Sequence, residues 1–215
     1  MIHIGWHRME QSRAVNVDGT RRLASACVQL GIRLVHVSTV DTLPAARSAA
    51  HPVDEQGCDG VQKVPCAYVV TKREAEQVVR ELVAAGDLDA VIVHPGFMLG
   101  PYDWKPSSGR MLLEVSRLPV VAAPRGGCSV CDARDVAAGI ANAIDMGEPG
   151  ESYILAGENI SYQDLWKHIL RVAGKRPRVF RLGPGVHWFG RIVDVANRLL
   201  PLQERDVNGA MIAMG

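Results

Sequence analysis

The sequence predicts an α/β protein built on a buried parallel sheet. Two apolar segments without alternation, residues 34–39 and 90–94, are typical of strands that are covered on both faces. A segment with helical spacing of apolar residues precedes each of them, at residues 14–30 and 69–85. This order of strands and helices favours a parallel sheet with right-handed crossovers.

Residues 1–5 begin the chain as a short apolar strand. The helix of residues 14–30 follows and ends before Gly31, because a glycine just past the last apolar residue is a common helix end. The spacing predicts that this helix turns five apolar side chains toward the core: Val15, Leu23, Ala26, Cys27 and Leu30.

Residues 44–65 are rich in Pro, Gly, Asp and Ala and predict a long surface loop. The helix of residues 69–85 comes next and ends before Gly86. Its core-facing stripe consists of Ala75, Val78, Val79, Leu82 and Val83. Ligands of open α/β sheets bind beyond the carboxyl ends of the strands. Three strand ends are therefore candidate site positions: residues 5–7, 38–39 and 95–97.

After Pro101 the predicted elements become shorter. Helices are expected at residues 111–117, 132–144, 161–173 and 186–200, and a strand at residues 153–156. Asp132 and Ser161 precede helical patterns and are predicted N-caps. We expect residues 1–101 and 132–150 to form the sheet domain. Residues 102–131 and 151–215 form a smaller lobe.

Composition excludes several classes of function. The 215 residues are 47% hydrophobic and carry a formal net charge of +1, so a nucleic-acid partner is not expected. No apolar run approaches the roughly 20 residues that a membrane span needs, and the N-terminus lacks a signal-peptide pattern. A cytoplasmic protein with reduced cysteines is expected.

Cys128 and Cys131 form a C-x-x-C pair. A zinc ribbon needs a second such pair, which Cys27, Cys58 and Cys66 do not supply. No metal site is predicted. A structural role is favoured over redox chemistry, because a cysteine without a disulfide generally behaves as a small buried hydrophobe.

Tyr68 and Lys72 lie four residues apart on the second predicted helix, so their side chains share one face. A phenol with its ordinary pKa of about 10 is a poor acid or base at pH 7, whereas a nearby ammonium lowers that pKa. The tyrosine can then exchange a proton with a substrate oxygen while hydride moves at carbon. Ordinary surface helices carry the same spacing, so neighbouring motifs must decide.

Four motifs supply that context: NVDGT at residues 16–20, a strand ending in ST at 38–39, YVVTK at 68–72 and HPGFMLGP at 94–101. In order and spacing they resemble the extended short-chain dehydrogenases/reductases, the NAD(P)-dependent epimerase/dehydratase proteins. The dihydroflavonol-4-reductase and hydroxysteroid-dehydrogenase branch is the most similar. The resemblance implies a partial Rossmann doubly wound parallel sheet with a small C-terminal α+β substrate lobe.

The resemblance also implies roles for individual residues. Tyr68 is the expected acid/base, and Lys72 is expected to lower its pKa and to hold the nicotinamide ribose. Thr39 is expected to orient the substrate oxygen, with Ser38 as the neighbour that can substitute, and Asn16 has a structural role. Besides Tyr68 and Lys72, the implied cofactor contacts are Gly5, Pro95, Gly96 and Phe97.

The expected cofactor is NAD or NADP, and the expected partner is a small-molecule substrate. In the resembled family, the helices that hold NVDGT and YVVTK often pair with a second subunit. The resemblance therefore makes a homodimer possible. The leading function is hydride transfer between nicotinamide and a carbonyl or alcohol.

The sequence departs from the family at its start. Members begin with a strand, a G-x-x-G-x-x-G turn and a helix, whose backbone N–H groups hold the pyrophosphate. No such stretch occurs here, and IHIG at residues 2–5 resembles the family's fourth strand. We therefore expect an N-terminally and C-terminally incomplete protein that, alone, binds cofactor poorly.

Two other functions stay open. A sugar-nucleotide epimerase or dehydratase uses the same tyrosine and lysine, but only scattered arginines could hold a nucleotide diphosphate: Arg110, Arg178 and Arg181. A non-catalytic Rossmann-type binding protein is the third possibility. The missing N-terminal motif favours it, whereas the intact Thr39, Tyr68 and Lys72 argue against it.

Overall fold

The computed structural model describes residues 8–48, 50–57, 60, 65–104 and 108–183. The chain divides into two compact units. Unit 1 comprises residues 1–96 and 135–155, and unit 2 comprises residues 97–134 and 156–215. The predicted strand at residues 1–5, with Gly5, and the predicted helix at 186–200 lie outside the described residues.

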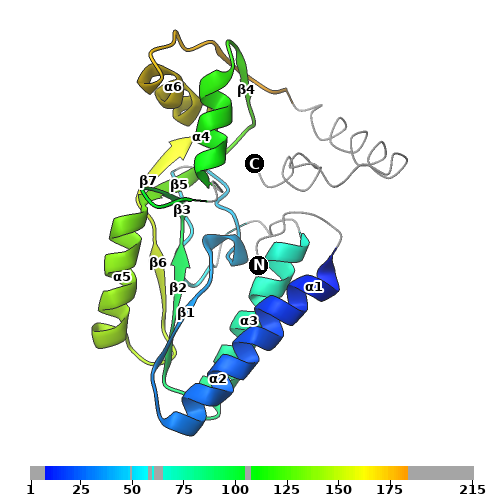
Figure 1. Cartoon of the computed structure of the whole chain (residues 1–215), viewed down its shortest axis with the longest axis vertical. Coiled ribbons are helices and arrows are strands. Elements are labelled where there is room, and N and C mark those ends of the chain that lie inside the picture. Colours follow the sequence, from blue (N-terminus) through cyan, green and yellow to red (C-terminus); the bar gives the residue numbers. More distant parts are fainter. Residues whose placement is uncertain (1–7, 49, 58–59, 61–64, 105–107, 184–215) are drawn as a thin grey trace. The chain divides into compact units, whose positions relative to one another are not determined.

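A parallel sheet forms the centre of unit 1. Its strands are β1 (Leu34–Val37), β2 (Ala90–Pro95) and β6 (Ser152–Leu155), in the order β1-β2-β6 (Figure 1). Every residue of β2 is buried, as its unbroken apolar sequence predicted. The predicted strand at 34–39 is shorter than expected, because Ser38 and Thr39 follow the end of β1.

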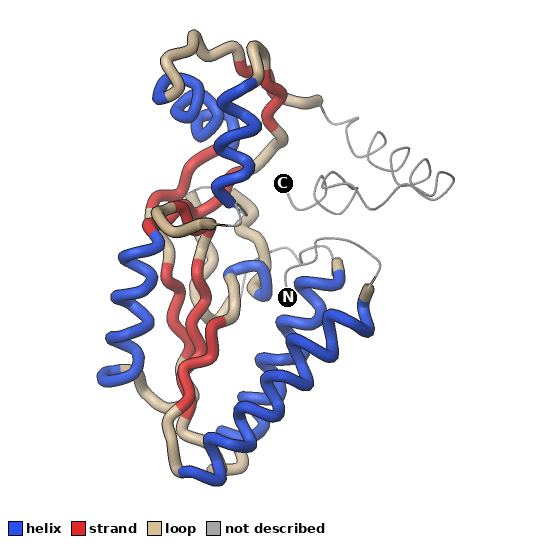
Figure 2. The backbone as a smooth tube through the Cα atoms, in the orientation of Figure 1, coloured by secondary structure: helices blue, strands red, loops and turns tan. Residues whose placement is uncertain are grey.

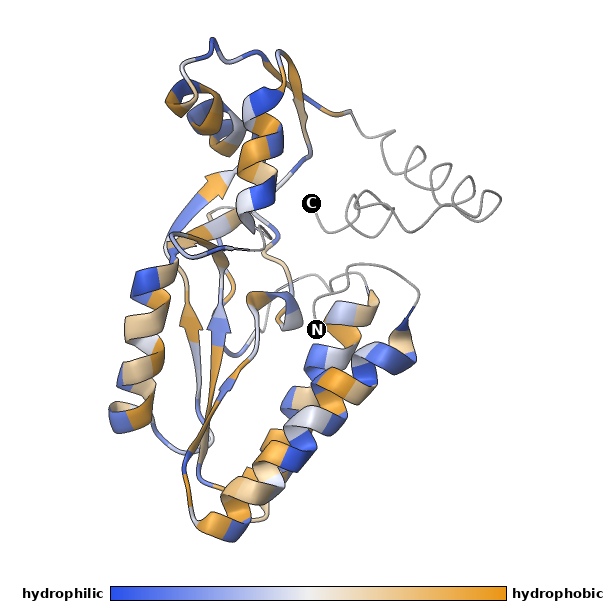
Figure 3. Ribbon diagram, in the orientation of Figure 1, coloured by the Kyte–Doolittle hydropathy of each residue, from blue (hydrophilic) through white to orange (hydrophobic). Residues whose placement is uncertain are grey.

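Helices cover both faces of this sheet, which confirms the doubly wound architecture. The helices α2 (Gly19–Leu30) and α3 (Ala67–Ala84) lie on one side of the strands, and α5 (Ala133–Met146) lies on the other (Figure 2). Ile92 packs in the cluster that includes Ala24 and Val79, whereas Val93 packs with Ala143. Along α2 and α3, hydrophobic and hydrophilic residues alternate by face (Figure 3).

The first helix of unit 1 is longer and less regular than predicted. It runs through α1 (Met9–Arg13), a π-helical segment η1 (Ala14–Asp18) and α2, and it ends at Gly31, whose φ is 62°. The predicted stripe is wrong at three positions, since Val15, Leu23 and Leu30 are 52%, 57% and 71% exposed. A π-helical segment has a wider turn, so it shifts the helical period between the residues before and after it. Cys27 is buried as predicted, and the other buried positions are Ser12, Asn16, Val17 and Ala24.

The segment between β1 and β2 positions the candidate site. A single 3₁₀ turn, η2 (Val40–Thr42), follows Thr39. Within the described part of residues 44–65 there is no helix or strand, and Glu55 accepts a hydrogen bond of 2.9 Å from the Ile154 backbone N–H at the edge of β6. Helix α3 then begins at Ala67, so Tyr68 lies in its first turn.

Unit 2 has an α+β arrangement. Its strands β3 (Phe97–Leu99), β5 (Gly127–Asp132) and β7 (Glu158–Ser161) form a mixed sheet, and β4 (Val121–Ala123) pairs with β8 (Val179–Arg181). Helices α4 (Ser108–Arg117) and α6 (Tyr162–Val172) complete it. The core consists of Val115, Val121, Ala123, Leu165, Trp166, Ile169 and Leu170.

Two predicted helix caps in this part of the chain are confirmed. The Ser161 hydroxyl accepts from the Asp164 backbone N–H at 3.1 Å, and the Asp132 carboxylate accepts from the Arg134 N–H at 2.8 Å. Strand β6 pairs with β2, so residues 152–155 lie in unit 1, whereas the prediction assigned residues from 151 onward to the lobe.

The described cysteines form no disulfide, and Cys27, Cys66 and Cys131 are buried. Among the described residues no group of three metal-ligating side chains comes together. None of the described helices is long and apolar enough to span a membrane.

Candidate active site

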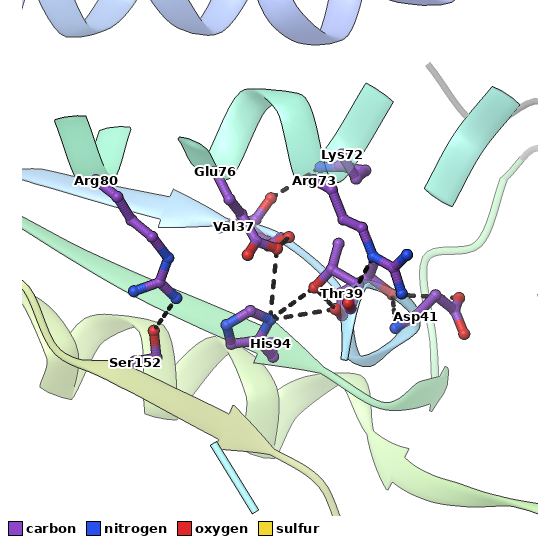
Figure 4. Close-up of polar contacts among 11 residues, drawn as sticks. Val37, Thr39, Asp41, Lys72, Arg73, Glu76, Arg80, His94 and Ser152 are labelled. Carbon is purple, nitrogen blue, oxygen red and sulfur yellow. Dashed lines mark hydrogen bonds and ion pairs between the residues drawn. The ribbon is translucent and has the colours of Figure 1, made fainter. Parts of the chain in front are cut away.

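Four predicted catalytic residues come together in unit 1. Ser38 and Thr39 follow the carboxyl end of β1, and the first two turns of α3 bring Tyr68 and Lys72 to the same place. Figure 4 shows Thr39 and Lys72 of this set. Ser38, Thr39 and Tyr68 are buried. The i, i+4 spacing places both α3 side chains on one helix face, as the sequence predicted.

Thr39 is the polar partner of Tyr68. The Thr39 hydroxyl lies near the phenol, where it lowers the pKa of Tyr68 by favouring the ionised form. Thr39 is also the N-cap of η2, where its hydroxyl accepts from the Asp41 backbone N–H at 3.3 Å. The turn therefore holds the hydroxyl beside the phenol, where both groups can face one substrate oxygen.

The charge state of Tyr68 differs from the prediction. Burial raises the pKa of Tyr68, and the hydrogen bond from Thr39 offsets only part of that increase. Lys72 donates to the Val37 carbonyl at 2.9 Å, and burial lowers its own pKa. The expected lowering of the Tyr68 pKa by Lys72 is therefore not observed, because this ammonium is directed to the end of β1.

The predicted cofactor contacts fall in three places. Pro95 ends β2, where it pairs with Leu155, and the Gly96 N–H donates to the Leu155 carbonyl at 2.9 Å. Phe97 begins β3 in unit 2. Of this set, Tyr68, Lys72, Pro95 and Gly96 therefore lie in unit 1, and Gly5 lies outside the described residues.

Sequence reasoning missed three buried polar residues beneath this site. Glu76 continues the face of Tyr68 and Lys72 at the next i+4 position, and that spacing could have identified it. His36 and His94 lie on neighbouring strands and read in the sequence as parts of apolar runs. Burial, Lys72 and His94 lower the pKa of His36 to about 4.

Asn16 and Thr71 join the two helices on this side of the sheet. The Asn16 amide donates to the Thr71 hydroxyl at 2.9 Å, and that hydroxyl donates to the Ala67 carbonyl at 2.7 Å. Asn16 lies in the π-helical segment η1, a helix type found frequently at functional sites. The contact fixes the start of α3, and with it Tyr68.

A family model described as male sterility protein, of an NAD-binding type, matches residues 6–131. The chain is 34% identical over 165 residues to a Synechocystis protein described as "Putative dihydroflavonol 4-reductase", covering 74% of this chain and 48% of that one. It is 32% identical over 174 residues to sterol demethylase protein B of Methylococcus capsulatus, covering 77% and 50%. The chain spans about half the length of these curated relatives.

The fold matches a solved structure over nearly its whole length. The crystal structure of gox2253 aligns with a TM-score of 0.78 at 32% identity, covering 97% of this chain and 63% of that one. Most of both units of this chain is therefore matched in a longer relative.

Proposed function

From the premise that this chain belongs to the NAD-binding male sterility protein family, among the extended short-chain dehydrogenases/reductases, we propose that it carries the proton-transfer part of an NAD(P)-dependent oxidoreductase site. The observation that supports this most is the proximity of the Thr39 hydroxyl to Tyr68, with Lys72 one helical turn away, at the carboxyl end of a parallel strand. Ligands of open α/β sheets bind at such ends.

In the proposed reaction the substrate is the carbonyl of a small organic molecule. Its oxygen accepts hydrogen bonds from the Thr39 and Tyr68 hydroxyls, and these polarise the carbonyl. When hydride reaches the carbonyl carbon, the oxygen takes the Tyr68 proton and an alcohol forms. The phenolate then regains a proton from solvent, and the reverse sequence oxidises an alcohol.

Tyr68 is protonated at neutral pH, because burial raises its pKa and disfavours the phenolate. Its hydroxyl can therefore donate a proton to a carbonyl oxygen.

Nicotinamide supplies or accepts the hydride when NAD or NADP is bound. Lys72 fits the ribose end of this cofactor, because an ammonium has three N–H donors and the Val37 carbonyl takes one. Pro95 and Gly96, at the end of β2, are proposed to line the nicotinamide, together with Phe97. The pyrophosphate end does not fit, since the sequence holds no G-x-x-G-x-x-G turn.

We therefore propose that the 215-residue chain alone binds cofactor weakly, that unit 1 is the cofactor unit, and that unit 2 is the substrate unit. Titration calorimetry with NADH and with NADPH tests the first point. Binding in the low micromolar range by the purified chain would overturn it, whereas the acid/base role of Tyr68 would still stand.

We also propose that α1, η1 and α3 form a homodimer face. A groove of about 560 Å³ lies between them, lined by charges of both signs: Glu10, Arg13, Asp18, Arg21, Glu74 and Glu81. A face that carries both charges can pair with its own copy across a two-fold axis. Light scattering during size-exclusion chromatography would give twice the chain mass for a dimer.

The sugar-nucleotide epimerase or dehydratase is the weaker candidate. It relies on arginines that could hold a diphosphate. These arginines lie on the surface of unit 2. Arg110 pairs with Glu114 at 3.1 Å, and Arg181 donates to Gln163 at 2.6 Å. Surface contacts of this kind do not build a diphosphate site.

A further inference from the structure

Three polar side chains lie buried beneath the Thr39 turn, between α3 and the sheet. Ser38, Glu76 and His94 are 5%, 7% and 0% exposed. Ser38 follows β1, whereas Glu76 lies on α3 and His94 on β2 (Figure 4 shows the last two). A carboxylate in such a place costs several kcal/mol unless it is well hydrogen-bonded. Helix formation alone therefore does not explain why the Glu76 carboxylate is buried.

The Glu76 carboxylate joins the other two residues. The same oxygen, Oε1, accepts a hydrogen bond from the Ser38 hydroxyl and lies 3.7 Å from His94 Nδ1. Burial lowers the pKa of Lys72 and the nearby Glu76 carboxylate opposes that shift, while Lys72 and Arg80 both lower the pKa of His36. Asp41 and Arg73 lie at the same turn, where the Thr39 hydroxyl donates to Asp41 at 3.3 Å and Arg73 donates to the Thr42 carbonyl at 2.8 Å.

The surroundings of His94 fix its tautomer. Nδ1 lies 3.2 Å from the Thr39 carbonyl oxygen and 3.2 Å from the Thr42 hydroxyl, whose own proton goes to that carbonyl at 2.8 Å. Nδ1 therefore faces acceptors on every side, counting Glu76, and must carry the proton. Within the described part of the chain, Nε2 has no hydrogen-bond partner, as suits an unprotonated nitrogen.

These contacts hold Thr39 from several directions. The Ser38 N–H donates to the Val93 carbonyl at 2.8 Å, and the Ser38 hydroxyl donates to the Glu76 carboxylate. The Thr39 carbonyl accepts from His94 and from the Thr42 N–H. The Thr39 hydroxyl donates to the Asp41 carboxylate at 3.3 Å, accepts from the Asp41 N–H at 3.3 Å, and lies beside Tyr68.

We propose that Glu76 and His94 are positioning residues, which clamp the Ser38–Thr39 turn so that the Thr39 hydroxyl is aimed at Tyr68. The role of the clamp in catalysis rests on the proposed function, whereas its contacts do not depend on that function. It places at the base of the site a carboxylate and an imidazole that touch neither substrate nor cofactor.

The test uses NMR on the 215-residue chain, in which only four tyrosines and seven histidines are present. Long-range ¹H–¹⁵N spectra should show His94 protonated at Nδ1. In Glu76→Gln, amide exchange at Asp41 and Thr42 should accelerate at least tenfold, while amides of β2 keep their rates. Glu81→Gln, an exposed position on the same helix, is the matched control.

Ser38→Ala removes one link of the clamp without changing any charge. Loss of the aimed Thr39 hydroxyl should raise the pKa of Tyr68, followed through the ¹³Cζ signal and assigned with Tyr68→Phe. Ser152→Ala, which lies on β6 and accepts from Arg80, should leave it unchanged. These measurements need neither cofactor nor substrate. A negative result here would therefore refute the clamp without refuting the proposed function.

Three results would overturn the clamp. They are a His94 protonated at Nε2, exchange at Asp41 and Thr42 that Glu76→Gln leaves unchanged, and exchange that accelerates equally throughout the chain. The last result would show general destabilisation rather than positioning. An unshifted Tyr68 titration in Ser38→Ala would remove the link to the site.

Discussion

The ammonium of Lys72 donates a hydrogen bond of 2.9 Å to the main-chain carbonyl of Val37 at the end of β1. This contact ties α3 to the strand that carries Ser38 and Thr39. It also directs the charge to the peptide carbonyl, while burial sets the pKa of Tyr68.

Lys72→Met should therefore change the titration of Tyr68 very little in the chain without cofactor. In the wild type the phenol should titrate above its ordinary pKa of about 10. Tyrosine ¹³C NMR between pH 7 and 12 measures both proteins, and Lys167→Met in unit 2 is the control. A Tyr68 pKa that rises by more than about one unit in Lys72→Met would show that the lysine already acts on the phenol.

His36 should make unit 1 sensitive to acid. Its pKa is about 4 in the folded chain and 6.5 ordinarily, so the unfolded state binds a proton first as the pH falls. The stability that depends on neutral His36 is complete above pH 6.5 and is lost between pH 6.5 and 4. The total loss is about 3 kcal/mol.

His36→Leu should flatten this dependence, because it removes the titrating group and keeps an apolar side chain of similar size. Urea unfolding at pH 7 and at pH 4.5 measures the difference. His168→Gln, an exposed position in unit 2, should retain the wild-type slope. An unchanged pH dependence in His36→Leu would assign the acid sensitivity to another group.

Thr71→Val should destabilise the junction of α3 with η1. The valine keeps the shape but removes the hydroxyl that accepts from Asn16 and donates to Ala67. The expected loss is about 1–3 kcal/mol, since a buried polar partner is left without this contact. Denaturant unfolding measures it, with the exposed Gln77→Ala as the reference. A loss below about 0.5 kcal/mol would contradict the role given to this contact.

Two glycines should respond to alanine in opposite ways. A Cβ at Gly127 would overlap the Ile160 carbonyl oxygen in the β5–β7 pairing, so Gly127→Ala should destabilise unit 2 by about 1–3 kcal/mol. Gly19 has helical dihedrals and nothing within 4 Å of the added Cβ. Gly19→Ala should stabilise by up to about 1 kcal/mol, and thermal unfolding of both variants compares them. Equal effects would contradict the packing.

The sequence predicted the parallel sheet correctly because β1 and β2 are short runs of β-branched residues that are covered on both faces. The sequence predicted that Thr39 and Tyr68 lie close together, because the end of β1 and the start of α3 converge in this topology. Val15 lies in η1, which departs from the 3.6-residue period. Leu23 and Leu30 lie in the regular helix α2, whose buried residues are Ala24 and Cys27.

The burial of Glu76 and His94 was not predicted from the sequence for a different reason. A glutamate on an amphipathic helix is normally solvated, and only the tertiary contact with Ser38 shows that this one is buried. The short strands of unit 2 had no periodicity that a window of a few residues could display. The C-x-x-C pair, Cys128 and Cys131, lies on β5 without a disulfide between the two cysteines.

The acid/base role of Tyr68 is tested most directly by turnover. The purified chain would be assayed for NADPH and NADH consumption at saturating cofactor, with a dihydroflavonol and with simple ketones as probes. Tyr68→Phe should lower kcat by about 10²- to 10⁴-fold while the affinity for NADPH changes less than about threefold. A Tyr68→Phe chain that turns over at the rate of the unmodified chain would contradict the account.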